Sequence, residues 1–107
     1  MANRFMPTAT EQLKQLGPLP PESTDDVALI QRWQDTLSQV ATPVDASEAE
    51  ILCTLFGPDG CFGLAWSLVH LIETATDVSD DYLTQFPPNE WIDLLRGRRE
   101  NAKNFAN

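Results

Sequence analysis

The chain has 107 residues, a length that corresponds to one domain covering residues 1–107. It carries 7 Lys and Arg residues against 16 Asp and Glu residues, for a formal net charge of -9, and 42% of its residues are hydrophobic. This composition is that of a folded globular protein and argues against nucleic-acid binding, because affinity for nucleic acid comes from neutralising phosphates. The longest apolar stretch, Phe62–Ile72, is shorter than the ~20 residues that span a bilayer, and the N-terminus lacks a signal-peptide pattern. We therefore expect a cytoplasmic protein that does not bind membranes.

Proline and glycine residues divide the chain into segments whose apolar residues recur every three or four positions. The pattern predicts helices over about 8–16, 24–41, 47–56, 60–76, 80–86 and 89–103. Residues expected to cap or start the second to fifth of these are Ser23 or Thr24, Asp45 or Ser47, Asp59, and Ser79 or Asp80. The prediction is an all-α fold, either a five- or six-helix bundle or a short stack of helix pairs, around the central apolar helix 60–76. Its predicted core includes Trp33, Leu37, Leu55, Phe56, Leu68, Leu71 and Leu95.

The predicted fourth helix is apolar on nearly all sides and has one narrow polar sector. Trp66 and Glu73 flank that sector, and His70 lies within it, so an aromatic ring, an imidazole and a carboxylate share one ledge. One interpretation is that the ledge is the solvent edge of a buried helix, or that His70 forms a hydrogen bond within the core. The other is that Trp66, His70 and Glu73 belong to a contact surface, because Trp is enriched at interface hot spots.

Charge is distributed unevenly along the chain. Residues 33–95 contain no Lys or Arg, and they contain eleven acidic residues: Asp35, Asp45, Glu48, Glu50, Asp59, Glu73, Asp77, Asp80, Asp81, Glu90 and Asp93. Unpaired charges are almost never buried, so we expect a broad negative surface without local counter-charge. Such a surface attracts a cationic partner.

Catalytic and metal-binding patterns are weak in this sequence. Cys61 lies near the start of the predicted fourth helix, where the helix dipole lowers the pKa of a thiol. The chain's one histidine, His70, is ~13 Å further along the same helix, so it cannot act as the base for Cys61. His70 and Glu73 have the spacing of metal ligands, but no second histidine exists. We expect no catalytic residue, cofactor or metal, and no enzyme activity; Cys53 and Cys61 are expected to be unpaired thiols.

One segment resembles a known class of protein. The segment Asp59-Gly-Cys-Phe-Gly-Leu-Ala-Trp66-Ser-Leu-Val-His70-Leu-Ile-Glu73-Thr-Ala75 is similar to a segment of small bacterial proteins of the toxin-immunity type. Those proteins neutralise polymorphic or contact-dependent toxins by binding them. The similar segment often continues into a proline, whereas Thr76 follows Ala75 here. The resemblance implies a bacterial, cytoplasmic, non-enzymatic inhibitor whose acidic surface faces a basic toxin domain.

The functional hypothesis is an immunity protein that binds a cationic cognate toxin domain through an acidic surface. The predicted partner-binding residues are Trp66, His70, Glu73, Asp77, Asp80 and Asp81. The alternative is an adaptor or oligomerising protein-protein interaction module with no toxin partner. A toxin gene next to the gene for this protein would favour the first hypothesis over the second.

Overall fold

The computed structural model describes residues 8–79 and 81–106, with side chains described as far as Ala102. All regular elements in these residues are helical, which confirms the predicted all-α fold. The elements are α1 (Ala9–Leu16), α2 (Val27–Leu37), α3 (Ala46–Cys53), η1 (Cys61–Gly63), α4 (Leu64–Glu73), η2 (Tyr82–Gln85) and α5 (Glu90–Ala106), where η denotes a 3-10 helix.

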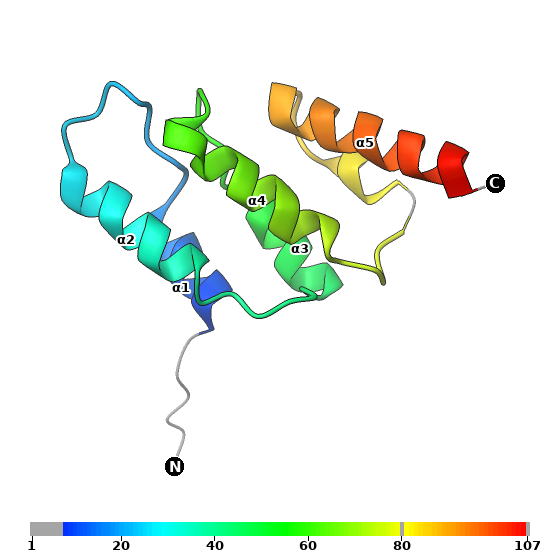
Figure 1. Ribbon diagram of the computed structural model, residues 1–107, viewed down its shortest axis with the longest axis horizontal. Coiled ribbons are helices and arrows are strands. Elements are labelled where there is room, and N and C mark those ends of the chain that lie inside the picture. Colours follow the sequence, from blue (N-terminus) through cyan, green and yellow to red (C-terminus); the bar gives the residue numbers. More distant parts are fainter. Residues whose placement is uncertain (1–7, 80, 107) are drawn as a thin grey trace, which may run out of the picture.

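Helix α4 lies in the middle of the bundle, as Figure 1 shows, with α2 on one side and α5 on the other. Helix α3 packs behind α4, and α1 packs against both α2 and α3. The predicted central helix is therefore right, although it covers 64–73 rather than 60–76. Because no helix covers its front, α4 keeps one side open to solvent.

Two capping boxes fix where α1 and α3 begin. The Thr8 hydroxyl accepts from the Glu11 amide, and the Glu11 carboxylate accepts in return from the Thr8 amide. Asp45 and Glu48 repeat this exchange at α3. The second carboxylate oxygen of Glu48 accepts from the hydroxyl of Thr10, at 2.9 Å, and Thr10 is almost fully buried. This partly buried hydrogen bond joins α1 to α3.

The predicted starts of the second and fifth helices are wrong. Helix α2 is capped by Asp26, whose carboxylate accepts from the Leu29 amide at 3.0 Å, and not by Ser23 or Thr24. The segment predicted as a fifth α-helix forms only the short 3-10 helix η2, without a side-chain cap. Pro87 sets the end of this segment, because a residue before proline avoids the helical region; Phe86 is extended, with ψ of 152°.

Six of the seven predicted core residues are buried. They come from four segments, and they are Trp33, Leu37, Leu55, Phe56, Leu68 and Leu95. Leu71 is half-buried, because it faces a groove between α2 and α4 that other side chains do not fill.

The connector between α1 and α2 lies directly against the segment that follows α3. The Leu19 amide donates to the Leu55 carbonyl at 2.9 Å. At Gly57 the two backbones come so close that a Cβ atom would lie 2.1 Å from the Leu19 carbonyl oxygen. Only glycine fits at this crossing.

Two buried side chains, a thiol and a phenol, can lose a proton in alkali. Cys53 and Tyr82 are 4% and 7% exposed, and both cysteines of the chain are free thiols. Burial, and then the negative charge of Glu50, raise the pKa of Cys53 from 9.0 to about 12. Burial also raises the pKa of Tyr82 from 10.0 to about 12. Both groups are therefore neutral in the folded protein over a wider pH range than in the unfolded chain.

These raised pKa values predict a loss of stability in alkali. A raised folded-state pKa gives stability that is complete below the unfolded-state pKa and is lost as pH rises towards the folded value. For Cys53 the loss begins near pH 9.0 and reaches about 4 kcal/mol by pH 12, because each step of one in pKa corresponds to about 1.4 kcal/mol. Urea unfolding at a series of pH values should show Cys53→Ala removing the component that begins near pH 9, and Tyr82→Phe the component that begins near pH 10. Identical pH profiles for the three proteins would contradict this account.

Candidate protein-interaction surface

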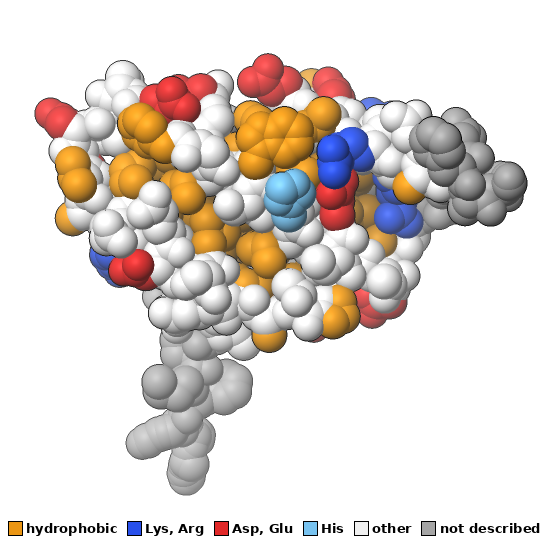
Figure 2. Space-filling view, viewed as in Figure 1, with side chains coloured by type: hydrophobic (Ala, Val, Ile, Leu, Met, Phe, Trp, Pro, Cys, Tyr) orange, Lys and Arg blue, Asp and Glu red, His pale blue; other side chains and the backbone are white. Residues whose placement is uncertain are grey.

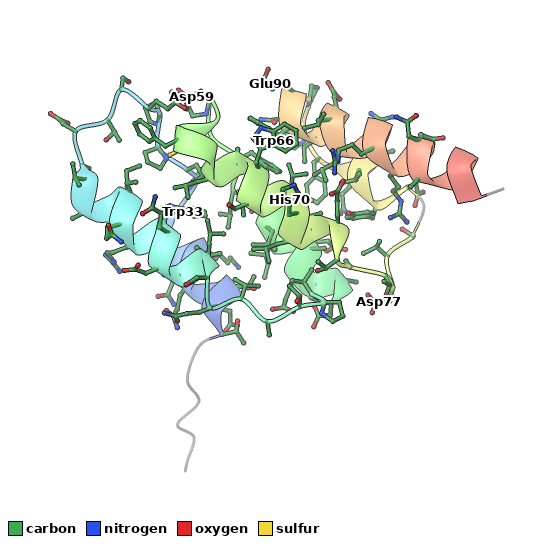
Figure 3. All side chains as sticks on the ribbon, in the orientation of Figure 1. Trp33, Asp59, Trp66, His70, Asp77 and Glu90 are labelled. Carbon is green, nitrogen blue, oxygen red and sulfur yellow. The ribbon has the colours of Figure 1, made fainter. Side chains whose placement is uncertain are left out.

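The open side of α4 carries an exposed aromatic pair. Trp66 is 41% exposed, and its ring centroid lies 6.1 Å from that of His70, which is also exposed. Figure 3 shows both side chains on the same side of α4. The two residues are one helical turn apart, and the prediction that they lie on the same side of the helix is confirmed.

Helix α5 supports the Trp66 ring from the side. Trp91 meets Trp66 edge-to-face, with centroids 5.6 Å apart, and Phe56 stacks on Trp91 at 5.9 Å. The guanidinium carbon of Arg98 lies 5.9 Å from the Trp66 ring centroid. Edge-to-face and cation–π contacts of this kind fix the orientation of a partly exposed ring. Trp66 is therefore held in place before any partner binds.

Glu73 has a counter-charge, the guanidinium of Arg98. Arg98 donates to both oxygens of the Glu73 carboxylate, with a distance of 3.0 Å from Nη2 to Oε1. This hydrogen bonding raises the pKa of Arg98. Figure 2 shows one basic and one acidic side chain beside the single histidine, and the expectation of no local counter-charge is wrong here. Both side chains are partly exposed, so the pair positions Arg98 over Trp66 rather than adding much stability.

The acidic run after α4 lies away from Trp66. Asp77 is exposed beyond the C-terminal end of α4, as Figure 3 shows, and Asp81 is exposed and accepts from the Ser79 hydroxyl at 3.0 Å. Asp80 lies outside the described residues. The guanidinium of Arg99 contacts this run, with Nη2 3.4 Å from the Ser79 carbonyl oxygen. The predicted site residues therefore form two regions, and each has an arginine of α5 beside it.

Most of the acidic charge is accessible. Among the fifteen acidic residues that the structure describes, all are exposed except Glu48 and Asp59, which are half-buried. The predicted negative surface is therefore real for most of the molecule, and Arg98 and Arg99 interrupt it near α5.

The sequence did not predict the turn that precedes α4. Cys61 and Phe62 have positive φ values of 46° and 54°, followed by Gly63 at 90°, and α4 begins only at Leu64. We call Cys61–Gly63 the Phe62 turn. Positive φ is costly for a non-glycine residue, at about 1–3 kcal/mol each. The turn nevertheless leaves the Phe62 ring 60% exposed.

Two carboxylates hold the Phe62 turn. The Phe62 amide donates to Glu22 at 2.9 Å, and the Cys61 amide donates to Asp59 at 3.0 Å. Asp59 also accepts from the Glu22 amide, so the two acidic residues are tied to each other. Asp59 therefore does not cap α4, whose N-cap position is Gly63.

The environment of Cys61 is the opposite of a reactive cysteine's. Its thiol is fully buried. Burial first, and then the negative charges of Asp59 and Glu22, raise its pKa. The expectation that a helix dipole lowers this pKa is wrong, because Cys61 precedes the helix and faces two carboxylates. Within residues 8–79 and 81–106, moreover, no three His, Cys, Asp or Glu side chains form a group that would hold a metal ion.

A groove of about 480 Å³ lies between α2 and α4 beside the Phe62 turn. Its lining is uncharged and consists of Gln34, Leu37, Ser38, Phe62, Gly63, Leu64, Ser67 and Leu71. Figure 2 shows hydrophobic side chains in this region, on the face that also carries the histidine. The groove, the Phe62 ring and the Trp66 ring therefore belong to one side of the molecule.

The fold and this surface define a small all-α protein with an exposed aromatic face. In the part of the chain that the structure describes, no helix combines the length and the apolar character needed to cross a bilayer. Comparisons of the chain with protein-family models, curated proteins and solved structures find no match.

Proposed function

We propose that this protein is an immunity protein that binds and neutralises a cationic bacterial toxin domain. The observation that carries the proposal is the Trp66 ring, which is 41% exposed and yet held by Trp91 and Arg98. Folding alone would favour burying this ring. A pre-positioned indole beside an arginine is typical of protein-protein interfaces, where Trp and Arg are enriched.

The acidic surface is the reason why we propose a basic partner. The net charge is -9, and nearly all described carboxylates are exposed. A field of this sign speeds the approach of a basic domain and repels acidic ones. The Glu73–Arg98 pair then lies at the rim of the aromatic contact, where a partner's charged groups can exchange hydrogen bonds with it.

Binding kinetics should separate the aromatic contact from the charge. Against the toxin domain encoded beside the gene, Trp66→Ala should speed dissociation about 30-fold, which corresponds to a loss of roughly 2 kcal/mol. Asp77→Lys should instead slow association, and the association rate of the unmodified protein should fall steeply as salt is added. Surface-based kinetics at low and high salt measures both rates.

Glu50→Lys is the matched control for charge, because Glu50 is exposed on α3, behind α4. It changes the net charge as Asp77→Lys does. Association should therefore slow less in Glu50→Lys if the toxin contacts the Asp77 region and not α3. Absence of binding at micromolar concentration, or an association rate that does not change with salt concentration, would contradict the proposal. Self-association of the protein in sedimentation, without toxin binding, would favour the oligomerising module.

A further inference from the structure

The Phe62 turn combines two features that folding alone does not favour with a hydrogen bond that holds them in place. Its two non-glycine residues have positive φ, the Phe62 ring is 60% exposed, and the backbone amide of Phe62 is held by Glu22, 40 residues away in sequence. A glycine at position 62 would adopt the same backbone without strain. Strained backbone that the surrounding structure enforces is concentrated at ligand-binding sites. In this turn an aromatic ring faces solvent while the Glu22 carboxylate holds the strained backbone.

The α2–α4 groove begins at this ring. Its lining includes the buried Leu37 and Leu64 and the half-buried Leu71, together with hydroxyl and amide side chains, most of which are exposed. A groove between two helices with leucines in its lining matches the apolar side of an amphipathic helix, whose contact residues recur at i, i+3, i+4 and i+7. Because Leu71 is half-buried and Phe62 exposed, both side chains have apolar surface left to bury.

Charge around the groove selects the occupant. The lining itself is uncharged, so it accepts an apolar ridge. The segments beside it carry the acids Glu22, Asp35 and Asp59 against one cation, Arg32. A helix with basic residues along its flanks complements this arrangement. A second copy of this chain would bring a further net charge of -9 and is disfavoured.

We infer that the α2–α4 groove binds a basic amphipathic helix of the partner, with the Phe62 ring inserted against the apolar side of that helix. The inference rests on the proposed function, because the helix belongs to the cationic toxin domain. It adds a docking element and a contact residue that Trp66, His70 and the acidic run do not include.

A synthetic peptide of roughly 15 residues tests the groove directly. The probe has leucines at i, i+3, i+4 and i+7 and lysines elsewhere, and a second peptide has glutamates in place of the lysines. Calorimetric titration should show binding of the lysine peptide, weakened at least tenfold by Phe62→Ala and by Phe62→Gly. Val27→Ala is the control, because Val27 is 74% exposed on α2 but does not line the groove, and it should leave binding unchanged.

Thermal stability separates a binding role of Phe62 from a structural one. Phe62→Gly relieves the positive φ, so its melting temperature should be unchanged or higher by up to about 4 °C. Phe62→Ala keeps the strain and should melt within about 2 °C of the unmodified protein. A drop of more than about 5 °C in both variants would overturn the inference, because the ring would then be structural.

The remaining outcomes also decide the question. Equal affinity for the glutamate peptide, or no peptide binding below about 1 mM, would overturn the inference. Toxin binding that depends on Trp66 but not on Phe62 would overturn it and leave the proposed function in place. Peptide binding that depends on Phe62, without any toxin binding, would support the groove and reject the proposed toxin.

Discussion

Gly57→Ala should lower the free energy of unfolding by about 3 kcal/mol or more. The added Cβ atom would lie 2.1 Å from the carbonyl oxygen of Leu19 and 2.9 Å from its carbonyl carbon. These are backbone atoms, so no side-chain rotation can relieve the overlap. The two segments would have to separate, and the hydrogen bond from the Leu19 amide to Leu55 would be strained. Denaturant unfolding of the purified variant measures the change.

Gly97→Ala is the matched control. Gly97 lies within α5, and a Cβ atom added there would meet no atom within 4 Å beyond the backbone of its own helix. Alanine is the better helix former, so this variant should be as stable as the unmodified protein or more stable by up to about 1 kcal/mol. Similar losses in both variants would show that the Leu19 crossing is not the cause.

Leu68→Ala should cost about 2–5 kcal/mol. Leu68 is fully buried in α4, which contacts α2, α3 and α5, so the cavity would open in the middle of the bundle. A loss of this size is a large part of the total stability of a small domain, which is about 5–15 kcal/mol. Chemical denaturation followed by circular dichroism measures it.

Leu71→Ala offers a comparison within the same helix and with the same change of side chain. Leu71 is half-buried and faces the α2–α4 groove, so less packing is lost and solvent fills the space. Its cost should be clearly smaller than that of Leu68→Ala. A loss under about 1 kcal/mol for Leu68→Ala would contradict the central position of α4.

The parts of the fold that local signals specify could be predicted from the sequence. Thr8 begins a helix as expected, and Asp45, one of the two expected starts of the third helix, begins α3. Each finds its partner three residues later in a capping box. The apolar spacing also predicted a central α4 and most of the core, since a periodic stripe must be buried. The shared surface of Trp66 and His70 follows from the same periodicity.

What could not be predicted depends on residues distant in the chain. The left-handed Phe62 turn is held by Glu22, and neither the turn nor Phe62's exposure has a local signal beyond the flanking Gly60 and Gly63. Arg98 reaches Glu73 across 25 residues, so a stretch without cations in the sequence acquires one in the fold. The contact of Trp91 with Trp66 likewise depends on how α5 packs against α4.

The carboxylate of Glu48 couples the first turn of α3 to the docking of α1. One oxygen completes the capping box at the start of α3, and the other receives the Thr10 hydroxyl from α1. If α1 undocks, one oxygen of the Glu48 carboxylate therefore loses its protein partner. If the first turn of α3 frays, the buried Thr10 hydroxyl loses its acceptor. The helix α1, only eight residues long, is thus tied by one hydrogen bond to a helix start more than thirty residues away.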